Sequence, residues 1–230
     1  MNHMKRILGI GIALCLQIII VLTCVEKMTF HLPYYEDQYF KNKVFDAVEM
    51  EPKELLFVTQ EMLLYLQDKR ETLDMKAQVN DVEKEFFNEK EKQHMKDVKN
   101  LFLVGYQIRR FSSILLVFSL LLLLLWQVPK WNDLLLKSIQ WVTGSLLISI
   151  FVISLIIMMD FSRSFTIFHQ IFFTNDLWLL DYETDWLIRM VPEPFFYDIS
   201  VKIGTWILFI LGLQWILTTF YFRKITRRRS

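Results

Sequence analysis

The sequence predicts an all-α, polytopic membrane protein, and three observations carry that prediction. Hydrophobic residues make up 53% of the 230 positions, modestly above the roughly 45–50% of an ordinary soluble domain. They are concentrated in four stretches, each long enough to cross a hydrocarbon core of about 30 Å as a helix. Only 6 Gly and 5 Pro interrupt the chain, which favours long helices. We therefore expect a single integral membrane domain over residues 1–230.

The four predicted spans are nearly free of charged residues and occupy residues 7–25, 111–128, 138–159 and 203–222. Small and hydroxyl-bearing residues in the last two spans suit close contact between helices in lipid. Two long segments connect the spans, at residues 26–110 and 160–202. Both are expected on the same side of the membrane, because two spans separate them.

Basic residues predict the orientation of the spans. The two termini and the short loop between the second and third spans carry nine Lys and Arg against one acidic residue, Asp133. By the positive-inside rule, both termini are cytoplasmic and the long segments are extracytoplasmic. Arg109 and Arg110 lie on the outer side against this trend, where their long side chains would snorkel to the headgroups. The net charge of +1 does not point to a nucleic-acid partner.

We expect an extracytoplasmic, amphipathic helical cap between the first and second spans. It opens with an aromatic, irregular run at residues 30–35. Pro52 then stands where a helix would begin, and apolar residues at helical spacing continue to about Arg70. Residues 73–79 alternate between apolar and polar side chains, which weakly predicts a short strand or an extended linker.

A second helix of the cap is predicted to begin at Asp81. Asn80 and Glu83 have the spacing of a capping box, a helix-start motif in which each side chain bonds the other residue's backbone N–H. The helix would carry His94 along one face and lead toward the second span. For most of this segment the simplest interpretation is a solvated cap that performs no chemistry.

The segment between the third and fourth spans is the chemically richest part of the chain. Residues 165–173 are too short to span the membrane but are dense in aromatic side chains, which predicts an interfacial or re-entrant helix. His169 lies within it. The residues that follow mix indole rings with carboxylates and amides before Pro192 and Pro194 stiffen the chain.

His94 and His169 are the candidate catalytic residues. An imidazole with an unperturbed pKa near 6.5 can accept and return a proton near neutral pH. Asp97 follows His94 by three residues on the same helical face, where it could hold one ring nitrogen. The competing interpretation is structural for both: a polar position on an amphipathic helix for His94, and a histidine buried among Phe side chains for His169.

The sequence gives less support to other kinds of active site. Glu91 with His94 and His169 could form a two-His, carboxylate metal site, but the chain has no His-Glu-x-x-His motif. It also has no Gly-x-Ser-x-Gly motif for a serine hydrolase. Both cysteines, Cys15 and Cys24, lie in the first span and provide no metal or redox motif. Two alternative functions remain: a non-catalytic membrane scaffold and a metal-dependent membrane hydrolase.

Two blocks of sequence around the histidines resemble the bacterial lipoprotein intramolecular transacylase family. The first block is Asn88-Glu89-Lys90-Glu91-x-x-His94-Met95-x-Asp97-Val98-Lys99-x-Leu101. The second comprises Phe168-His169-x-x-Phe172-Phe173-x-Asn175-Asp176-x-Trp178-x-Leu180-Asp181 and Asp185-x-Leu187-Ile188-x-Met190-x-Pro192-x-x-Phe195-Phe196-x-Asp198. The resemblance covers essentially the whole chain, and these blocks are its specific part. Tyr182 departs from it, because the family pattern has Pro there.

The resemblance implies an acyltransferase of the bacterial plasma membrane that acts on diacylated lipoproteins. The family moves an acyl chain from the glyceryl group on the N-terminal cysteine to the α-amine of that cysteine, giving the lyso-form lipoprotein. Its functional histidines carry over to His94 and His169. The resemblance implies no cofactor and no metal. We expect a monomer in contact with membrane lipid, with its active site at the outer leaflet.

This chemistry needs a proton acceptor and an oxyanion donor. The α-amine has a pKa near 8, so a neutral histidine must remove a proton before or during attack on the ester. Which histidine accepts and which donates is left open by the sequence. Candidates for stabilising the oxyanion or orienting the substrate are Asp97, Arg163, Asn175, Trp178 and Asp185. Space for acyl chains is expected between the spans, lined by Phe and Leu.

Overall fold

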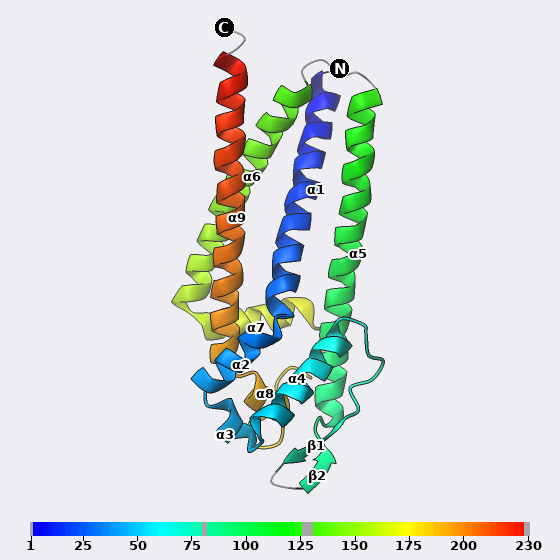
Figure 1. Ribbon diagram of the computed structural model, residues 1–230, viewed down its shortest axis with the longest axis vertical. Coiled ribbons are helices and arrows are strands. Elements are labelled where there is room, and N and C mark those ends of the chain that lie inside the picture. The colour runs from blue at the N-terminus through cyan, green and yellow to red at the C-terminus, as the bar shows by residue number, and fades with distance from the viewer. Residues whose placement is uncertain (1, 80–81, 126–130, 228–230) are drawn as a thin grey trace. The chain divides into compact units, whose positions relative to one another are not determined.

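The computed structural model describes residues 2–79, 82–125 and 131–227 (Figure 1). In chain order the elements are α1 (Asn2–Thr29), α2 (Leu32–Lys41), α3 (Val44–Val48), α4 (Pro52–Leu66), β1 (Lys76–Val79), β2 (Val82–Glu85), α5 (Glu89–Leu125), α6 (Trp131–Met159), α7 (Phe161–Phe172), α8 (Trp186–Met190) and α9 (Glu193–Arg227). Helices dominate, as the sequence predicts. The predicted second span reaches residue 128, and its last three residues lie outside the described part of the chain.

The chain divides into two compact units. The bundle unit comprises residues 1–26, 106–159 and 201–230, and the mixed unit comprises residues 27–105 and 160–200. Four helices are long and apolar enough to cross a membrane: α1, α5, α6 and α9. Each contains one predicted span, apart from the three residues of the second span that are not described. The prediction of a four-span membrane protein is therefore confirmed.

In the bundle unit, α1 packs against segments of the other three long helices. Near its start, Ile12 is buried against Leu123 of α5, with Leu135 of α6 beside them. Near its end, Cys24 is buried with Ile207 and Leu211 of α9. Figure 1 shows α1 running between α5 and α6. Most outward side chains of α6 and α9 are apolar and exposed, as expected of helices whose solvent is lipid.

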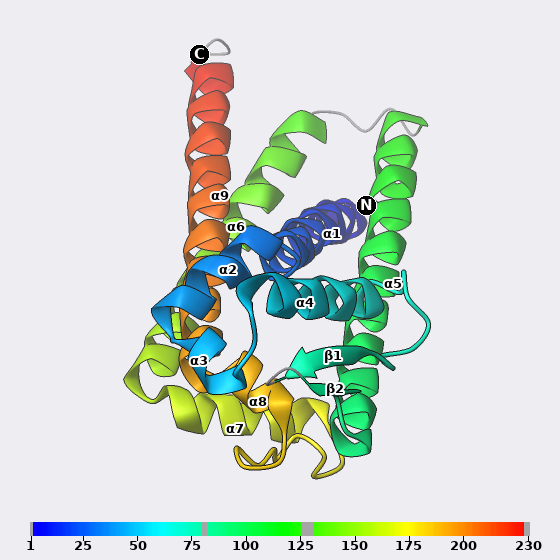
Figure 2. The same ribbon diagram turned by 60° about the horizontal axis from the view of Figure 1, so that its bottom comes forward.

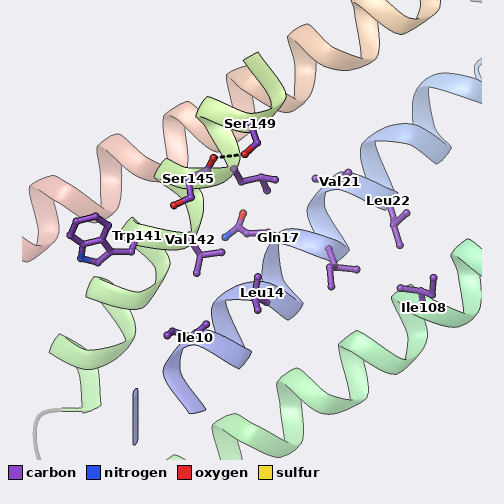
Figure 3. Close-up of a pocket in the computed structure, with 12 residues that line it drawn as sticks. Ile10, Leu14, Gln17, Val21, Leu22, Ile108, Trp141, Val142, Ser145 and Ser149 are labelled. Atoms are coloured by element: carbon purple, nitrogen blue, oxygen red, sulfur yellow. Dashed lines mark hydrogen bonds between the residues drawn. The ribbon is translucent and has the colours of Figure 1, made fainter. Parts of the chain in front are cut away.

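A cavity of about 670 Å³ lies within the bundle unit, between α1 and α6 with Ile108 of α5 at its edge. Figure 3 shows Gln17 of α1 directed toward Val142 and Ser145 of α6. The remaining lining is mostly aliphatic, from residues of α1 and α6. The cavity lining includes Leu but no Phe, unlike the lining expected for acyl-chain space between the spans.

The mixed unit has an aromatic core built by α2, α4 and the start of α9. The Tyr35 ring lies 4.9 Å from the Phe195 ring, and the Tyr35 hydroxyl donates to the Thr29 carbonyl. The Tyr39 and Thr59 hydroxyls are hydrogen-bonded at 2.9 Å. The expectation of an irregular run over residues 30–35 was wrong for residues 32–35, because α2 begins at Leu32 with a proline in its first turn. Proline is well tolerated there, where its missing N–H has no helical partner anyway.

The helix predicted from Pro52 is present as α4, with Pro52 in its first turn. The weak prediction of a strand over residues 73–79 is confirmed by β1, which pairs antiparallel with β2. This hairpin corrects the prediction of a helix beginning at Asp81. Asn80 and Asp81 lie outside the described residues, but Glu83 belongs to β2 and α5 begins at Glu89. Cross-strand pairing therefore prevails over the local helix-start pattern at residues 80–83.

Three further elements complete the mixed unit. α7 is a 12-residue helix that begins one residue after α6 ends. A loop then runs from Phe173 to Asp185 and leads into the short α8. Figure 2 shows α7, this loop and α8 close together. The predicted helix over residues 165–173 is thus present, ending at Phe172.

Candidate active site

The first turn of α5 is fixed by a reciprocal pair, Asn88 and Glu91. The Glu91 backbone N–H donates to the Asn88 side-chain oxygen at 3.0 Å. In return, the Asn88 backbone N–H donates to the Glu91 carboxylate at 2.7 Å. This is a capping box, eight residues later than the one expected at Asn80 and Glu83. It fixes the start of the helix that carries His94 one turn further on.

The second carboxylate oxygen of Glu91 joins α5 to α8. It accepts the Leu187 backbone N–H at 2.6 Å, and Glu91 is 0% exposed. Both carboxylate oxygens are therefore hydrogen-bonded to backbone N–H groups. From the sequence, Glu91 was predicted only as a possible metal ligand. The signal that could have revealed its positioning role is the Asn-x-x-Glu spacing of residues 88–91.

Asp185 joins the same two regions from the other side. Its carboxylate accepts from the Asn88 amide at 2.8 Å, from Lys90 at 3.3 Å and from the Asp181 backbone N–H at 2.7 Å. Asp185 is 2% exposed. Burial alone would raise its pKa, but these hydrogen bonds, with one from Thr184, outweigh burial and lower the pKa. Asp185 thus acts as a charged anchor, and no hydrogen bond to either imidazole is found among the described residues.

His169 is held in an aromatic box. The Trp178 ring stacks on it with centroids 4.9 Å apart, and the Phe165 ring lies 4.2 Å away. Its Nδ1 lies 2.7 Å from the Phe165 carbonyl oxygen. A carbonyl only accepts, so Nδ1 carries the hydrogen and donates it. In the neutral ring this leaves the Nε2 lone pair as the proton-accepting site.

The environment of His169 favours its neutral form. The ring is 7% exposed. Burial lowers its pKa below the ordinary value of 6.5, and the hydrogen bond to the Phe165 carbonyl opposes this only in part. Desolvation acts in this direction because it penalises the charged imidazolium. Burial therefore favours the uncharged form of the His169 ring.

His94 faces His169 from α5. The two ring centroids are 6.1 Å apart with an interplanar angle of 32°, and both residues belong to the mixed unit. Phe173 presents an edge contact to His94 at 5.2 Å. His94 is 6% exposed, and its Nδ1 has no hydrogen-bond partner among the described residues. The two histidines, far apart in sequence, therefore lie side by side in a largely apolar setting.

Asp97 does not make the contact expected of it. Its carboxylate accepts the Asn175 side-chain amide at 2.9 Å, and within the described residues no hydrogen bond joins it to His94. Asn175 also caps its own loop by accepting the Leu177 backbone N–H. The Asp97–Asn175 pair thus ties α5 to the loop that carries Trp178. The expectation that Asp97 fixes the His94 tautomer is corrected accordingly.

We expect Asp97→Ala and Asn175→Ala to lower the rate of the reaction at this site by the same few-fold factor. Because one hydrogen bond is removed by either change, the double variant should lose no more than a single one. An exposed charged hydrogen bond is worth about 1 kcal/mol, so the loss is expected to be about fivefold. A double-mutant cycle on product formation measures it, and additive losses would contradict the pairing.

The remaining candidates separate clearly. Trp178 contacts His169, as described above. Arg163 does not, because it is exposed and lies six residues before His169, roughly 120° around α7. The described hydrogen bond of Arg163 is made by its backbone N–H, which donates to the Asp160 side chain at the start of the helix. The structure therefore does not bring Arg163 together with His169, and its role as an oxyanion donor stays a prediction.

Tyr182, where the family pattern has Pro, lies in a turn held by other residues. The Asp181 side chain accepts the Glu183 backbone N–H, and its carbonyl accepts the Asp185 N–H at 2.8 Å. Arg189 donates to the Tyr182 and Glu183 carbonyls. These bonds close the turn without a proline and place Asp185 beside Asn88 and Lys90.

The arrangement is suited to moving a proton beside a polar reaction centre. Two imidazoles face each other, and the tautomer of His169 is fixed by its hydrogen bond to Phe165. The pKa of both rings is lowered, chiefly by burial, and that of His94 falls to about 4. In residues 2–79, 82–125 and 131–227, no group of three His, Cys, Asp or Glu side chains is placed to hold a metal ion. Glu91, the carboxylate once considered as a ligand, has both oxygens on backbone N–H groups.

Structures of known proteins match this fold over its full length. A structure of the membrane-integral lipoprotein intramolecular transacylase Lit from Bacillus cereus is similar at a TM-score of 0.80 and 22% sequence identity, covering 100% of both chains. Two structures of that protein with a histidine replaced by arginine or by alanine match at TM-scores of 0.74 and 21% identity. They cover 100% and 99% of this chain, respectively, and 96% of the other chain in each case. At these identities the likeness establishes the fold.

Family membership rests on the sequence. Comparison with curated protein sequences gave no match. The family model described as "Lipoprotein intramolecular transacylase Lit" matches residues 10–196, a range that includes the first histidine-bearing block and all but the last two positions of the second. This chain is therefore a multi-pass membrane acyltransferase that belongs to the lipoprotein intramolecular transacylase family.

Proposed function

We propose that this enzyme transfers an ester-linked acyl chain from the glyceryl group of a diacylated lipoprotein to the α-amine of its N-terminal cysteine. The amine nitrogen forms a bond to the ester carbonyl carbon, and the bond from that carbon to the glyceryl oxygen breaks. One amine proton ends on the released glyceryl hydroxyl. The products are an N-acyl amide and a free hydroxyl on one molecule, the lyso-form lipoprotein. The observation that carries the proposal is the facing pair His94 and His169.

His169 is the proposed proton acceptor. Its Nδ1–H is committed to the Phe165 carbonyl, which leaves Nε2 free to take the amine proton. Its lowered pKa keeps the ring neutral where the reaction must run. After the tetrahedral intermediate forms, the same Nε2–H can return the proton to the departing glyceryl oxygen. One histidine can therefore serve both halves of the reaction.

His94 is proposed to support the oxyanion or share the proton. A second imidazole beside the first can donate a hydrogen bond to the developing negative charge, a contribution worth roughly 3–4 kcal/mol of barrier when the donor is preorganised. Its unpartnered Nδ1 supports this role, because a buried polar atom without a partner is costly and a substrate atom would satisfy it. Protonation of both rings at once is disfavoured, since two positive charges would lie about 6 Å apart with little solvent.

The apolar surroundings favour transfer over hydrolysis. Phe165, Phe173 and Trp178 surround the imidazoles, and both histidines are almost fully buried. Exclusion of water removes the competing nucleophile. The amine and the ester belong to one molecule, so the enzyme needs only to orient them.

The proposed location follows from charge and chemistry. The basic termini are proposed to be cytoplasmic, with the mixed unit extracytoplasmic, where an anchored lipoprotein presents its glyceryl group. We propose that the enzyme acts as a monomer in contact with membrane lipid, without a cofactor. Ester-to-amide transfer is downhill and requires no nucleotide.

The test uses a synthetic diacylated lipopeptide with a ¹³C-labelled acyl chain on its ester. The purified enzyme in lipid nanodiscs should produce a species of unchanged mass whose fragments carry the label on the cysteine amine. Tandem mass spectrometry distinguishes this from hydrolysis, which adds water and releases a labelled fatty acid. Label recovered only as free acid would contradict acyl transfer and favour a hydrolase.

The two alternatives predict different results in the same assay. A scaffold would tolerate changes at both histidines but lose its partner when a residue of α4 such as Leu63 or Leu66 is changed. Both of these leucines are buried, so a folding control is needed for them. A metal-dependent enzyme would lose activity after thorough chelation and regain it on addition of the metal.

The pH dependence should separate the histidine from the substrate amine. Because the pKa of His169 is lowered, the titration of this residue in the pH–rate profile is expected below pH 6.5. Activity should still rise between pH 6 and 8, following the amine with its pKa near 8. Stability should fall only as the pH drops below 6.5, since the unfolded imidazole then binds protons first. Profiles of kcat/KM against pH test this. A titration above pH 6.5 that does not shift when the pKa of the substrate amine is changed would contradict it.

A further inference from the structure

One face of α7 is apolar and exposed, and the ring contacts that its Phe168 makes among the described residues are with α7 itself and with Phe173, which follows it. The outer stripe, defined as Ile167, Phe168, Ile171 and Phe172, is well exposed, with Ile171 at 69%. No Asp, Glu, Lys or Arg occurs between residues 164 and 174. Four large apolar side chains on adjacent helical positions are too large a patch for contact with water alone.

α7 divides into three faces. The outer stripe occupies one face. Phe165 and His169 lie on a second face, directed into the protein, and His169 is buried there. Thr166 and Gln170 lie on a third face, which is polar and exposed. A helix with an apolar face, a polar face and low charge between them has the pattern of a helix lying in a membrane interface.

Chain connectivity sets where α7 begins. α6 is an apolar membrane-crossing helix that continues to Met159, and Asp160 alone separates it from Phe161 at the start of α7. One residue covers less than about 4 Å, so α7 must start at the level where α6 leaves the hydrocarbon. The Asp160 side chain caps α7 by accepting the Arg163 backbone N–H, so the break between the two helices is built into the sequence.

We infer that the outer stripe of α7 is inserted into the lipid at the boundary between headgroups and acyl chains, so that α7 lies along the membrane surface rather than re-entering it. The occupant of this face is the lipid of the surrounding bilayer. Because His169 is on the adjacent face of the same helix, the insertion depth of the stripe sets the depth of the imidazole. This inference deepens the proposed function, since the glyceryl esters of an anchored lipoprotein lie at that boundary.

Spin labels on α7 test the inference without relying on activity. The full chain is placed in phospholipid nanodiscs with Cys15 and Cys24 replaced by Ala, and a nitroxide is attached in turn at Ile167, Ile171, Thr166 and Gln170. Oxygen collects in hydrocarbon, whereas a nickel chelate stays in water. The ratio of oxygen to nickel accessibility should be higher at Ile167 and Ile171 than at Thr166 and Gln170. Equal ratios at all four positions would overturn the inference.

A different labelling result would identify another occupant of the outer stripe. Protection of Ile167 and Ile171 from both reagents would show that protein, such as a second copy of the chain, covers the stripe, and the inference would fail.

Ile171→Glu should lower kcat/KM about tenfold because burying the stripe contributes to placing His169, whereas Gln170→Glu should leave it unchanged. The His169→Ala variant should retain the wild-type accessibility pattern. A correct pattern in an enzyme that makes no amide product would refute the proposed function and leave the insertion of α7 intact.

Discussion

Replacement of His169 by alanine is expected to lower the rate of acyl transfer by a factor of roughly 10²–10⁴, the usual contribution of a general acid–base group. The hydrogen bond from Nδ1 to Phe165 leaves Nε2 as the ring nitrogen that can accept a proton. Without it, the proposed acceptor of the amine proton is lost, and His94 is left as the other imidazole beside the site. The rate is measured by mass spectrometry of the labelled lipopeptide.

Two controls separate chemistry from packing. His169→Phe keeps an aromatic ring between Phe165 and Trp178 but removes the base, so it should be as inactive as His169→Ala while retaining the stability of the wild type more closely. His31→Ala changes an exposed histidine at the start of α2 and should leave the rate unchanged. An active His169→Phe enzyme would mean that the ring serves packing and not proton transfer.

Replacement of Glu91 by alanine is expected to destabilise the protein by about 3 kcal/mol or more. The change removes the carboxylate partner of the buried Leu187 backbone N–H and of the part-buried Asn88 backbone N–H, and hydrogen bonds to charged groups are each worth roughly 1.5–3 kcal/mol. The first turn of α5 should fray, and activity should fall with it because His94 follows one turn later. Denaturant unfolding in detergent, followed by circular dichroism, measures the loss.

The matched control is Glu89→Ala, two residues earlier on the same turn. The Glu89 side chain is 80% exposed and pairs with Lys92 at the surface, where an ion pair contributes about 0–1 kcal/mol. Its removal should be nearly silent. Equal losses of stability in Glu91→Ala and Glu89→Ala would contradict a stabilising role for the capping box and for the hydrogen bond from Glu91 to α8.

The membrane-crossing helices could be predicted from the sequence because their signal is local and strong. An uninterrupted apolar stretch of about 20 residues has few structural solutions, and lipid enforces the helical one. The start of α5 was harder. Asn80 and Glu83 match the same helix-start pattern as Asn88 and Glu91, and only the pairing of β1 with β2 decides between them.

The sequence predicted the two histidines of the candidate site and several residues around them, but it did not predict how those residues pair. His94 and His169 could be singled out because imidazoles are rare in this chain, which has four. The partners of a side chain cannot be derived from its position along one helix, so Asp97 was matched to His94 instead of Asn175. Asp185 was predicted as a candidate for orienting the substrate, and the spacing of residues 88–91 could have revealed the capping role of Glu91. The hydrogen bonds of both residues to segments almost 100 residues away could not be predicted from local spacing.

The claim on which the mechanism depends is that His169 is a neutral imidazole with its hydrogen on Nδ1 and a free Nε2. Nitrogen-15 NMR of the histidine-labelled enzyme in nanodiscs measures this directly, with the His169→Phe variant identifying the signal among four histidines. The mechanism predicts a protonated Nδ1 and an unprotonated Nε2 that persist below pH 6.5. A hydrogen on Nε2, or a doubly protonated ring at neutral pH, would contradict the role of His169 as the base.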